Sequence, residues 1–378
     1  MKKKGLIDAI ATVTGTTIGA GIFGLPYVFV KAGFLVGIIN MIIIFFAILI
    51  INLYTARITL ITKKPFELTS YIEKLIGKKG KHYMALLMML SIIGALLAYI
   101  IGIGEAISTI FNLNFFVASL ISFLILSIIV FFDLKGVKES ETILTFFLII
   151  VAILIIIFGF TKFDINNINF KSDFSLYNLY FPYGVILFSF LCLAALPEVR
   201  QEIKGNEKDL KKAIIIGTTI PLIIYILFVF AVVGVSGKNT TEIATIGFSK
   251  LGFFVKIFSN IFVILAMSTS FITLALALRW VLQYDYKINK FIAWFISCFI
   301  PLFLFLIGFR NFIKILSFTG SIAGGLQLIL ITIAAKKTEK MKNKYLKNFK
   351  VPLNNIIIFL LLLIFILGII HQIIFLFK

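Results

Sequence analysis

Glycine and proline are concentrated at one place in the first long apolar segment of the chain. Residues 14–26 read TGTTIGAGIFGLP, with four glycines and one proline, and this density disfavours a continuous helix. An interrupted helix inside a membrane bares N–H and C=O groups, which are tolerated only where they line a cavity or hold a ligand. The N–H groups that begin a half-helix favour an anion, and the carbonyls that end one favour a cation. The run therefore predicts a site for the two charges of a zwitterion.

A second apolar segment, at 179–198, carries weaker signals of the same kind. It contains Pro182, Gly184 and Pro197 around the sequence FSFLC at 188–192. Paired interruptions at matching positions of two five-helix halves are typical of a transporter site at the membrane midplane. Taken alone, the second segment favours a plainer interpretation, in which small residues only allow close helix packing.

Polar side chains on two further apolar segments could contribute to this site. Glu105 shares a face with small residues spaced four apart, so it points into the bundle, where an acid is a functional candidate. Its position near the outer end is equally consistent with a solvated group, and Tyr99 fits a cavity wall or a packed core equally well. Thr269 and Ser270 could coordinate a small cation, although such hydroxyls often bond their own backbone.

The composition indicates a membrane protein. Of the 378 residues 61% are hydrophobic and only 14% are charged, which a soluble domain could not accommodate. The net charge of +20 lies in short loops between apolar runs, so it does not indicate a nucleic-acid partner. The sequence contains no GxxxxGK[ST] run for a nucleotide, and Cys192 and Cys298 form neither a metal motif nor a disulfide framework.

Eleven segments are long and apolar enough to cross a bilayer as helices. They are residues 6–30, 34–61, 82–110, 114–132, 138–160, 179–198, 211–235, 252–283, 291–308, 311–335 and 355–377. If the N-terminus lies inside, 27 of the 36 basic residues fall on the inner side and nine on the outer side. The positive-inside rule therefore predicts a multi-pass protein of the cell membrane, surrounded by lipid, with a cytoplasmic N-terminus and an extracellular C-terminus.

The run GTTIGAGIFGLPY at 15–27 resembles the first-helix signature of amino acid permeases of the amino acid–polyamine–organocation superfamily, closest in style to the aromatic or neutral amino acid branch. Pieces in the expected order strengthen the resemblance: PFE at 65–67, LKGVKE at 134–139 and PEV at 197–199. The resemblance implies an all-α LeuT-type fold within a single transmembrane domain, 1–378. It comprises two inverted five-helix repeats, 6–160 and 179–335, with helices 1 and 6 broken, and an eleventh helix at 355–377.

The same resemblance implies a substrate site and an ion site. The substrate set comprises Thr17, Gly19, Ala20, Gly21, Phe23, Tyr99, Phe188, Phe190 and Cys192. Backbone N–H groups of 19–21 would hold a carboxylate, carbonyls near Thr17 and Phe188 would hold an ammonium, and the aromatic residues and Cys192 would line the side-chain pocket. The coupling-ion set comprises Gly15, Ile18, Ala266, Thr269 and Ser270.

The expected function is secondary active transport of a neutral or aromatic amino acid by alternating access. Sodium is preferred as the coupling ion, because residues 139–161 lack the lysine that replaces it in some proton-coupled relatives, although Glu105 keeps a proton route open. We expect no cofactor apart from this ion. An ion-independent exchanger and an amino-acid sensor remain alternatives. A membrane-embedded enzyme is disfavoured, because the two histidines are isolated and few acids lie inside the spans. The sequence indicates no protein partner.

Overall fold

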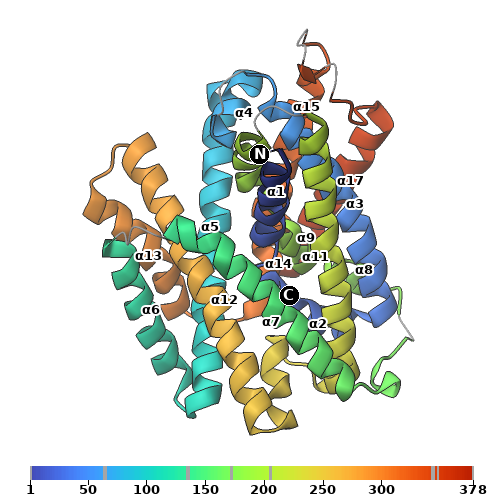
Figure 1. The fold of residues 1–378 in the computed structure, drawn as a ribbon, viewed down its shortest axis with the longest axis vertical. Helices are drawn as coiled ribbons and strands as arrows, with labels where there is room; N and C mark the ends of the chain where they lie inside the picture. The colour runs from blue at the N-terminus through green and yellow to red at the C-terminus, as the bar shows by residue number, and fades with distance from the viewer. Residues whose placement is uncertain are drawn as a thin grey trace.

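The apolar segments fold into one bundle of helices, shown from the side with its long axis vertical in Figure 1. This computed structural model describes residues 2–62, 66–132, 137–170, 173–203, 207–341, 345–346 and 349–376. Within these ranges the regular structure is helical and contains no strand. The N-terminus and the short helix α4 (Leu68–Ile76) lie at one end of the bundle. Within each helix the backbone N–H and C=O groups bond to one another, as a lipid environment requires.

The helices follow one another with short connections. In chain order they are α1 (Lys2–Thr17), α2 (Gly21–Ala32), α3 (Phe34–Thr59), α4, α5 (Lys78–Phe111), α6 (Phe115–Phe132), α7 (Val137–Thr161), η1 (Ile165–Asn167), α8 (Leu176–Tyr180), α9 (Tyr183–Phe190), η2 (Leu193–Ala195), α10 (Leu196–Ile203), α11 (Glu207–Ser236), η3 (Gly237–Asn239), η4 (Ala244–Leu251), α12 (Phe253–Trp280), η5 (Val281–Asp285), α13 (Lys290–Leu306), α14 (Phe312–Phe318), η6 (Thr319–Gly324), α15 (Gly325–Thr338) and α17 (Asn355–Leu376).

All eleven predicted spans have a helical counterpart. In the described part of the chain, eight helices are long and apolar enough to cross a membrane, and the bent pair α1 and α2 adds a ninth. Two shorter apolar helices, the described part of α7 from Ile149 and the 17-residue α13, stand at the predicted fifth and ninth spans. The all-α prediction is therefore confirmed.

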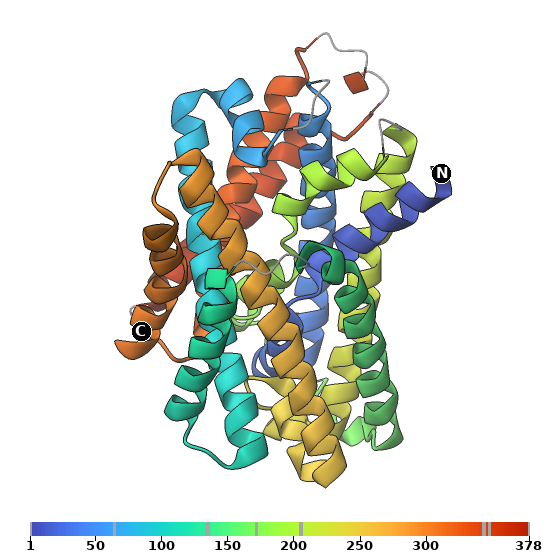
Figure 2. The ribbon, with the colours of Figure 1, turned by 60° about the vertical axis from the view of Figure 1, so that its left-hand side comes forward.

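Besides the stretch between α9 and α10, two irregular stretches lie deep in the bundle. The η6 segment is a π-helix between α14 and α15, a form that is frequent at functional sites. It packs against α9 and α5, and Gly320 of η6 lies directly against the backbone of Gly184. The other irregular stretch is the junction of α1 and α2. Figure 2 shows α1 leaning away from the long axis of the bundle.

Candidate functional site

The first helix breaks in the middle of its glycine-rich run. Helix α1 ends at Thr17, α2 begins at Gly21, and the two axes differ by 53°. Pro26 is not the cause of the break, because it lies buried within α2. Because of the break, the last carbonyls of α1 and the first N–H groups of α2 have no hydrogen-bond partner within their own helix. Both polarities required for a zwitterion therefore meet at residues 18–20.

The sixth span is interrupted after Phe190. Leu191 has an extended backbone with ψ of 117°, and Cys192 has φ of −138° and ψ of 19°. Pro182 stands at the cap of α9 and Pro197 in the first turn of α10, where a missing N–H costs little. The prolines that indicated an interruption in the sequence therefore mark helix starts, and the interruption lies between them.

Tyr225 of α11 connects the two interruptions. Its hydroxyl lies 2.7 Å from the Thr17 carbonyl oxygen and 2.8 Å from the Ser189 carbonyl oxygen. The side chain is fully buried, and its ring packs edge-on against Phe190 with centroids 5.2 Å apart. The sequence patterns did not predict this residue. They predicted carbonyls near Thr17 and Phe188 at this point; the Phe188 carbonyl itself accepts the N–H of Leu191, and that of the next residue, Ser189, accepts the Tyr225 hydroxyl.

A proline explains why this part of α11 collects polar contacts. Pro221 lies inside the helix and has no N–H for the Gly217 carbonyl, which instead accepts the Thr14 hydroxyl at 3.3 Å. Next to Gly217, the Thr218 hydroxyl accepts the Asn52 amide at 3.2 Å. Positions 217, 221 and 225 share one helical face, so the spacing of glycine, proline and tyrosine was the signal that could have revealed Tyr225.

Three predicted residues from three different helices meet beside the first break. A methyl group placed on Gly19 would find only the Tyr99 hydroxyl nearby, at 3.8 Å, so open space borders Gly19. The Tyr99 side chain is in contact with Ser270 of α12. The structure therefore brings together members of the predicted substrate set and of the predicted ion set.

Other residues of the predicted substrate set pack elsewhere. The Phe23 ring lies between Phe228 and Phe262, with centroids 6.5 and 5.2 Å away, and the Phe190 ring faces α11 and α3. Ala20 and Gly21 are buried, and a methyl group on Gly21 would overlap Ser189, so Gly21 allows α2 to touch α9.

The remaining two residues of the set are placed differently. Phe188 is half-buried. The buried Cys192 side chain contacts Thr17 and Asn52, beside the end of α1.

The predicted ion set is only partly assembled. Ser270 donates to the Ala266 carbonyl at 2.9 Å, and Thr269 donates to the carbonyls of Leu265 and Ala266 at 3.0 and 3.1 Å. A hydroxyl that donates its proton can still accept through its oxygen lone pairs. Gly15 and Ile18 lie at the end of α1, which packs mainly on α11 and α10 rather than on α12. Helix α7 touches both α1 and α12.

At each end of the bundle, a side chain donates a hydrogen bond to a carboxylate on another segment. Towards the N-terminal end of the bundle, Thr12 of α1 donates to Glu202 of α10 at 2.8 Å. Towards the other end, Asn311 before α14 donates to Glu242 at 2.7 Å. Glu105 is half-buried and interacts electrostatically with Glu242, so it belongs to this second end and not to the break.

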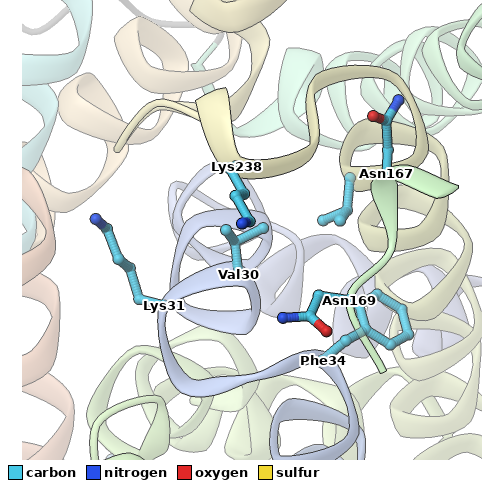
Figure 3. A pocket seen from close by; sticks show the side chains of 7 residues that line it. Val30, Lys31, Phe34, Asn167, Asn169 and Lys238 are labelled. Atoms are coloured by element: carbon cyan, nitrogen blue, oxygen red, sulfur yellow. The ribbon is translucent and has the colours of Figure 1, made fainter. Parts of the chain in front are cut away.

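A separate pocket lies where α2 turns into α3. It has a volume of about 260 Å³, and Figure 3 shows its lining side chains. They are Val30, Lys31, Phe34, Asn167, Asn169, Val233 and Lys238. None of these belongs to either predicted set, so this pocket is distinct from the site at the two interruptions.

Comparison with known proteins agrees with this architecture. Over 353 residues the chain is 24% identical to glutamine transporter 2 of Aliivibrio fischeri (strain ATCC 700601 / ES114), covering 89% of this chain and 91% of the relative. The structure of MhsT in complex with L-phenylalanine superposes with a TM-score of 0.68 at 14% identity, covering 96% of this chain and 98% of MhsT. A manganese transporter of Eremococcus coleocola, in complex with an aromatic bis-isothiourea substituted compound, gives 0.67 at 12% identity, covering 97% and 85%.

These likenesses confirm the predicted LeuT-type fold. The model of the tryptophan/tyrosine permease family matches residues 2–372, nearly the whole chain. This match confirms the predicted amino acid permease and excludes the alternative of a membrane-embedded enzyme. The chain is therefore a member of the tryptophan/tyrosine permease family, a membrane protein that transports amino acids.

Proposed function

We propose that the protein is a secondary active transporter that carries a neutral or aromatic amino acid together with sodium by alternating access. It would lie in the cell membrane with its N-terminus in the cytoplasm and its C-terminus outside. The observation that carries the proposal is the meeting of Gly19, Tyr99 and Ser270 beside a bent first helix. There, helix ends of opposite polarity lie next to hydroxyls from two other helices.

The substrate class rests on the chemistry of the break and on the relatives. The N–H groups that begin α2 suit a carboxylate, and the carbonyls at Thr17 and Ser189 suit an ammonium. The aromatic Tyr99 and the half-buried Phe188 would meet an apolar or aromatic side chain. The matching family is named for tryptophan and tyrosine, and a relative is named as a glutamine transporter. A similar structure is a complex with L-phenylalanine.

Sodium as the coupling ion is supported by the residues near α12. The Thr269 and Ser270 hydroxyls donate to carbonyls and can still accept, and hydroxyl and carbonyl oxygens suit a small hard cation. Helix α7, which touches both α1 and α12, presents the buried apolar side chains of Val151 and Ala152 in place of a lysine. Residues 139–161 contain no lysine, so this part of α7 offers no fixed ammonium in place of a sodium ion.

A thermal-shift screen of the purified protein against the common amino acids, in sodium chloride and in choline chloride, tests the proposal. We expect one or a few neutral amino acids to raise the melting temperature, and only with sodium, because a ligand stabilises the state that binds it. If no amino acid raises it in either salt, the proposal fails.

A matched pair of variants then tests the ion site. Thr269→Ala combined with Ser270→Ala should abolish the sodium requirement. Ser297→Ala is the control, because that hydroxyl also bonds a carbonyl one turn earlier, on α13. Unchanged sodium dependence in the double variant would contradict the ion site, and stabilisation that follows pH instead would favour a proton route through Glu105.

A further inference from the structure

Tyr225 is placed where a single hydroxyl must serve two helix ends. Its oxygen lies 2.7 Å from the carbonyl oxygen that ends α1 and 2.8 Å from the carbonyl oxygen of Ser189 at the end of α9. A phenol has one proton and can donate it fully to one acceptor at a time. One of the two carbonyls is therefore always short of a donor.

The surroundings make this shortage costly. Tyr225 and Phe190 are 0% exposed, and Ser189 and Thr17 are 1% and 3% exposed. A buried carbonyl without a donor loses the hydrogen bond that it would make to water. The two carbonyls also lie at the negative ends of two half-helices, which face each other across the hydroxyl. The arrangement therefore favours a group that brings more donors and a positive charge.

We propose that Tyr225 is a placeholder for the substrate ammonium, which takes over one of the two carbonyls when the amino acid binds. The hydroxyl then keeps the other carbonyl, and both acceptors have a donor. This inference rests on the function proposed above and adds a residue to its site. Without substrate, the Tyr225 hydroxyl is shared between the carbonyls of the two interrupted helices. When the ammonium binds one carbonyl, the hydroxyl donates to the other alone.

The replacement Tyr225→Phe separates this role from a structural one. Without the hydroxyl neither carbonyl has a donor in the empty protein, so the empty protein should melt at a lower temperature. The ammonium then meets two unpaired acceptors, so substrate should bind about fivefold to tenfold more tightly than in the wild type. Release should be slower, so the maximal rate of transport in proteoliposomes should fall.

Tyr54→Phe is the matched control. Tyr54 is also fully buried, and its hydroxyl also donates to a backbone carbonyl, that of Pro352, far along the chain from either interruption. We expect this variant to melt at a lower temperature with unchanged substrate affinity. The probes are L-tryptophan, L-tyrosine and L-glutamine, together with their α-hydroxy acid analogues, which lack the ammonium. Only the amino acids should bind more tightly to Tyr225→Phe.

If Tyr225→Phe binds amino acids with unchanged or weaker affinity, Tyr225 is a structural brace and the proposal is wrong. If the variant is not recovered in folded form, a fluorinated tyrosine at position 225 provides the test. Its more acidic phenol is a stronger donor, so it should weaken amino acid binding, and unchanged binding would overturn the proposal. Failure of the wild type to bind any amino acid would instead refute the proposed function.

Discussion

The two interrupted helices are broken by different means. At the first, Gly19 lies beside open space, and the surrounding run of glycines weakens the helix locally. At the second, Leu191 and Cys192 are neither glycine nor proline, and α9 is instead pressed against α14 and η6, where Gly184 meets Ser317 of α14 and Ser321 of η6. The first break is therefore encoded in its own sequence, whereas the second depends on a neighbouring helix about 130 residues further along the chain.

This difference has a consequence for movement. A break with locally weak helix preference can bend without help, while a break imposed by packing changes only if its neighbour moves. The π-helix η6 carries Gly320 against α9, so shifts of the tenth span would be transmitted to the second break. Tyr225 would transmit them to the first.

The largest expected effect is at the contact that imposes the second break. Gly320→Val should prevent folding or lower stability by about 3 kcal/mol, because its Cβ would overlap the Gly184 carbonyl and approach the Phe188 nitrogen to 2.8 Å. The measurement is the yield and melting temperature of the detergent-purified protein.

Gly325→Ala, one turn away in α15, is the matched control. Its Cβ would meet the end of the Ile369 side chain at 3.2 Å, and that side chain can rotate away. A well-folded Gly320→Val protein would show that α9 is not held by this contact, and the contrast between the two breaks would then be lost.

The next effect separates function from packing within the first break. Gly21→Ala should lower stability by about 2 kcal/mol, because the new methyl overlaps Ser189, with 2.7 Å to its Cα. Gly19→Ala should leave the melting temperature nearly unchanged, since its methyl meets only the Tyr99 hydroxyl at 3.8 Å. It should weaken amino acid binding about tenfold by occupying the open space. Equal effects of the two substitutions on stability and binding would contradict the assignment of Gly19 to the site.

Sequence analysis was accurate where the information is local. The eleven apolar segments and the first break follow from hydropathy and from glycines at 15–24, and the structure has a helix at each segment and a bend at the first break. It was less accurate where the surroundings of a residue depend on side chains from distant segments. Phe23 and Phe190 look like pocket residues in the sequence, yet they fill aromatic core, because their neighbours Phe228, Phe262 and Tyr225 come from other helices. The spacing of Gly217, Pro221 and Tyr225 marks a polar face of α11, but the role of Tyr225 arises only because two chain segments end beside it.

The smallest expected effect concerns how the first break is anchored to α11. Thr14→Val should cost about 1 kcal/mol, because it leaves the Gly217 carbonyl without a donor, and the hydrogen bond it removes is long, at 3.3 Å. Pro221→Ala would restore an N–H one turn after Gly217, so the helix itself would satisfy that carbonyl. In the Pro221→Ala background, Thr14→Val should therefore have little effect on the melting temperature. If the two substitutions are instead additive, the Thr14 hydroxyl does not replace the bond that the proline removes, and α1 is held to α11 by apolar packing and the Tyr225–Thr17 hydrogen bond.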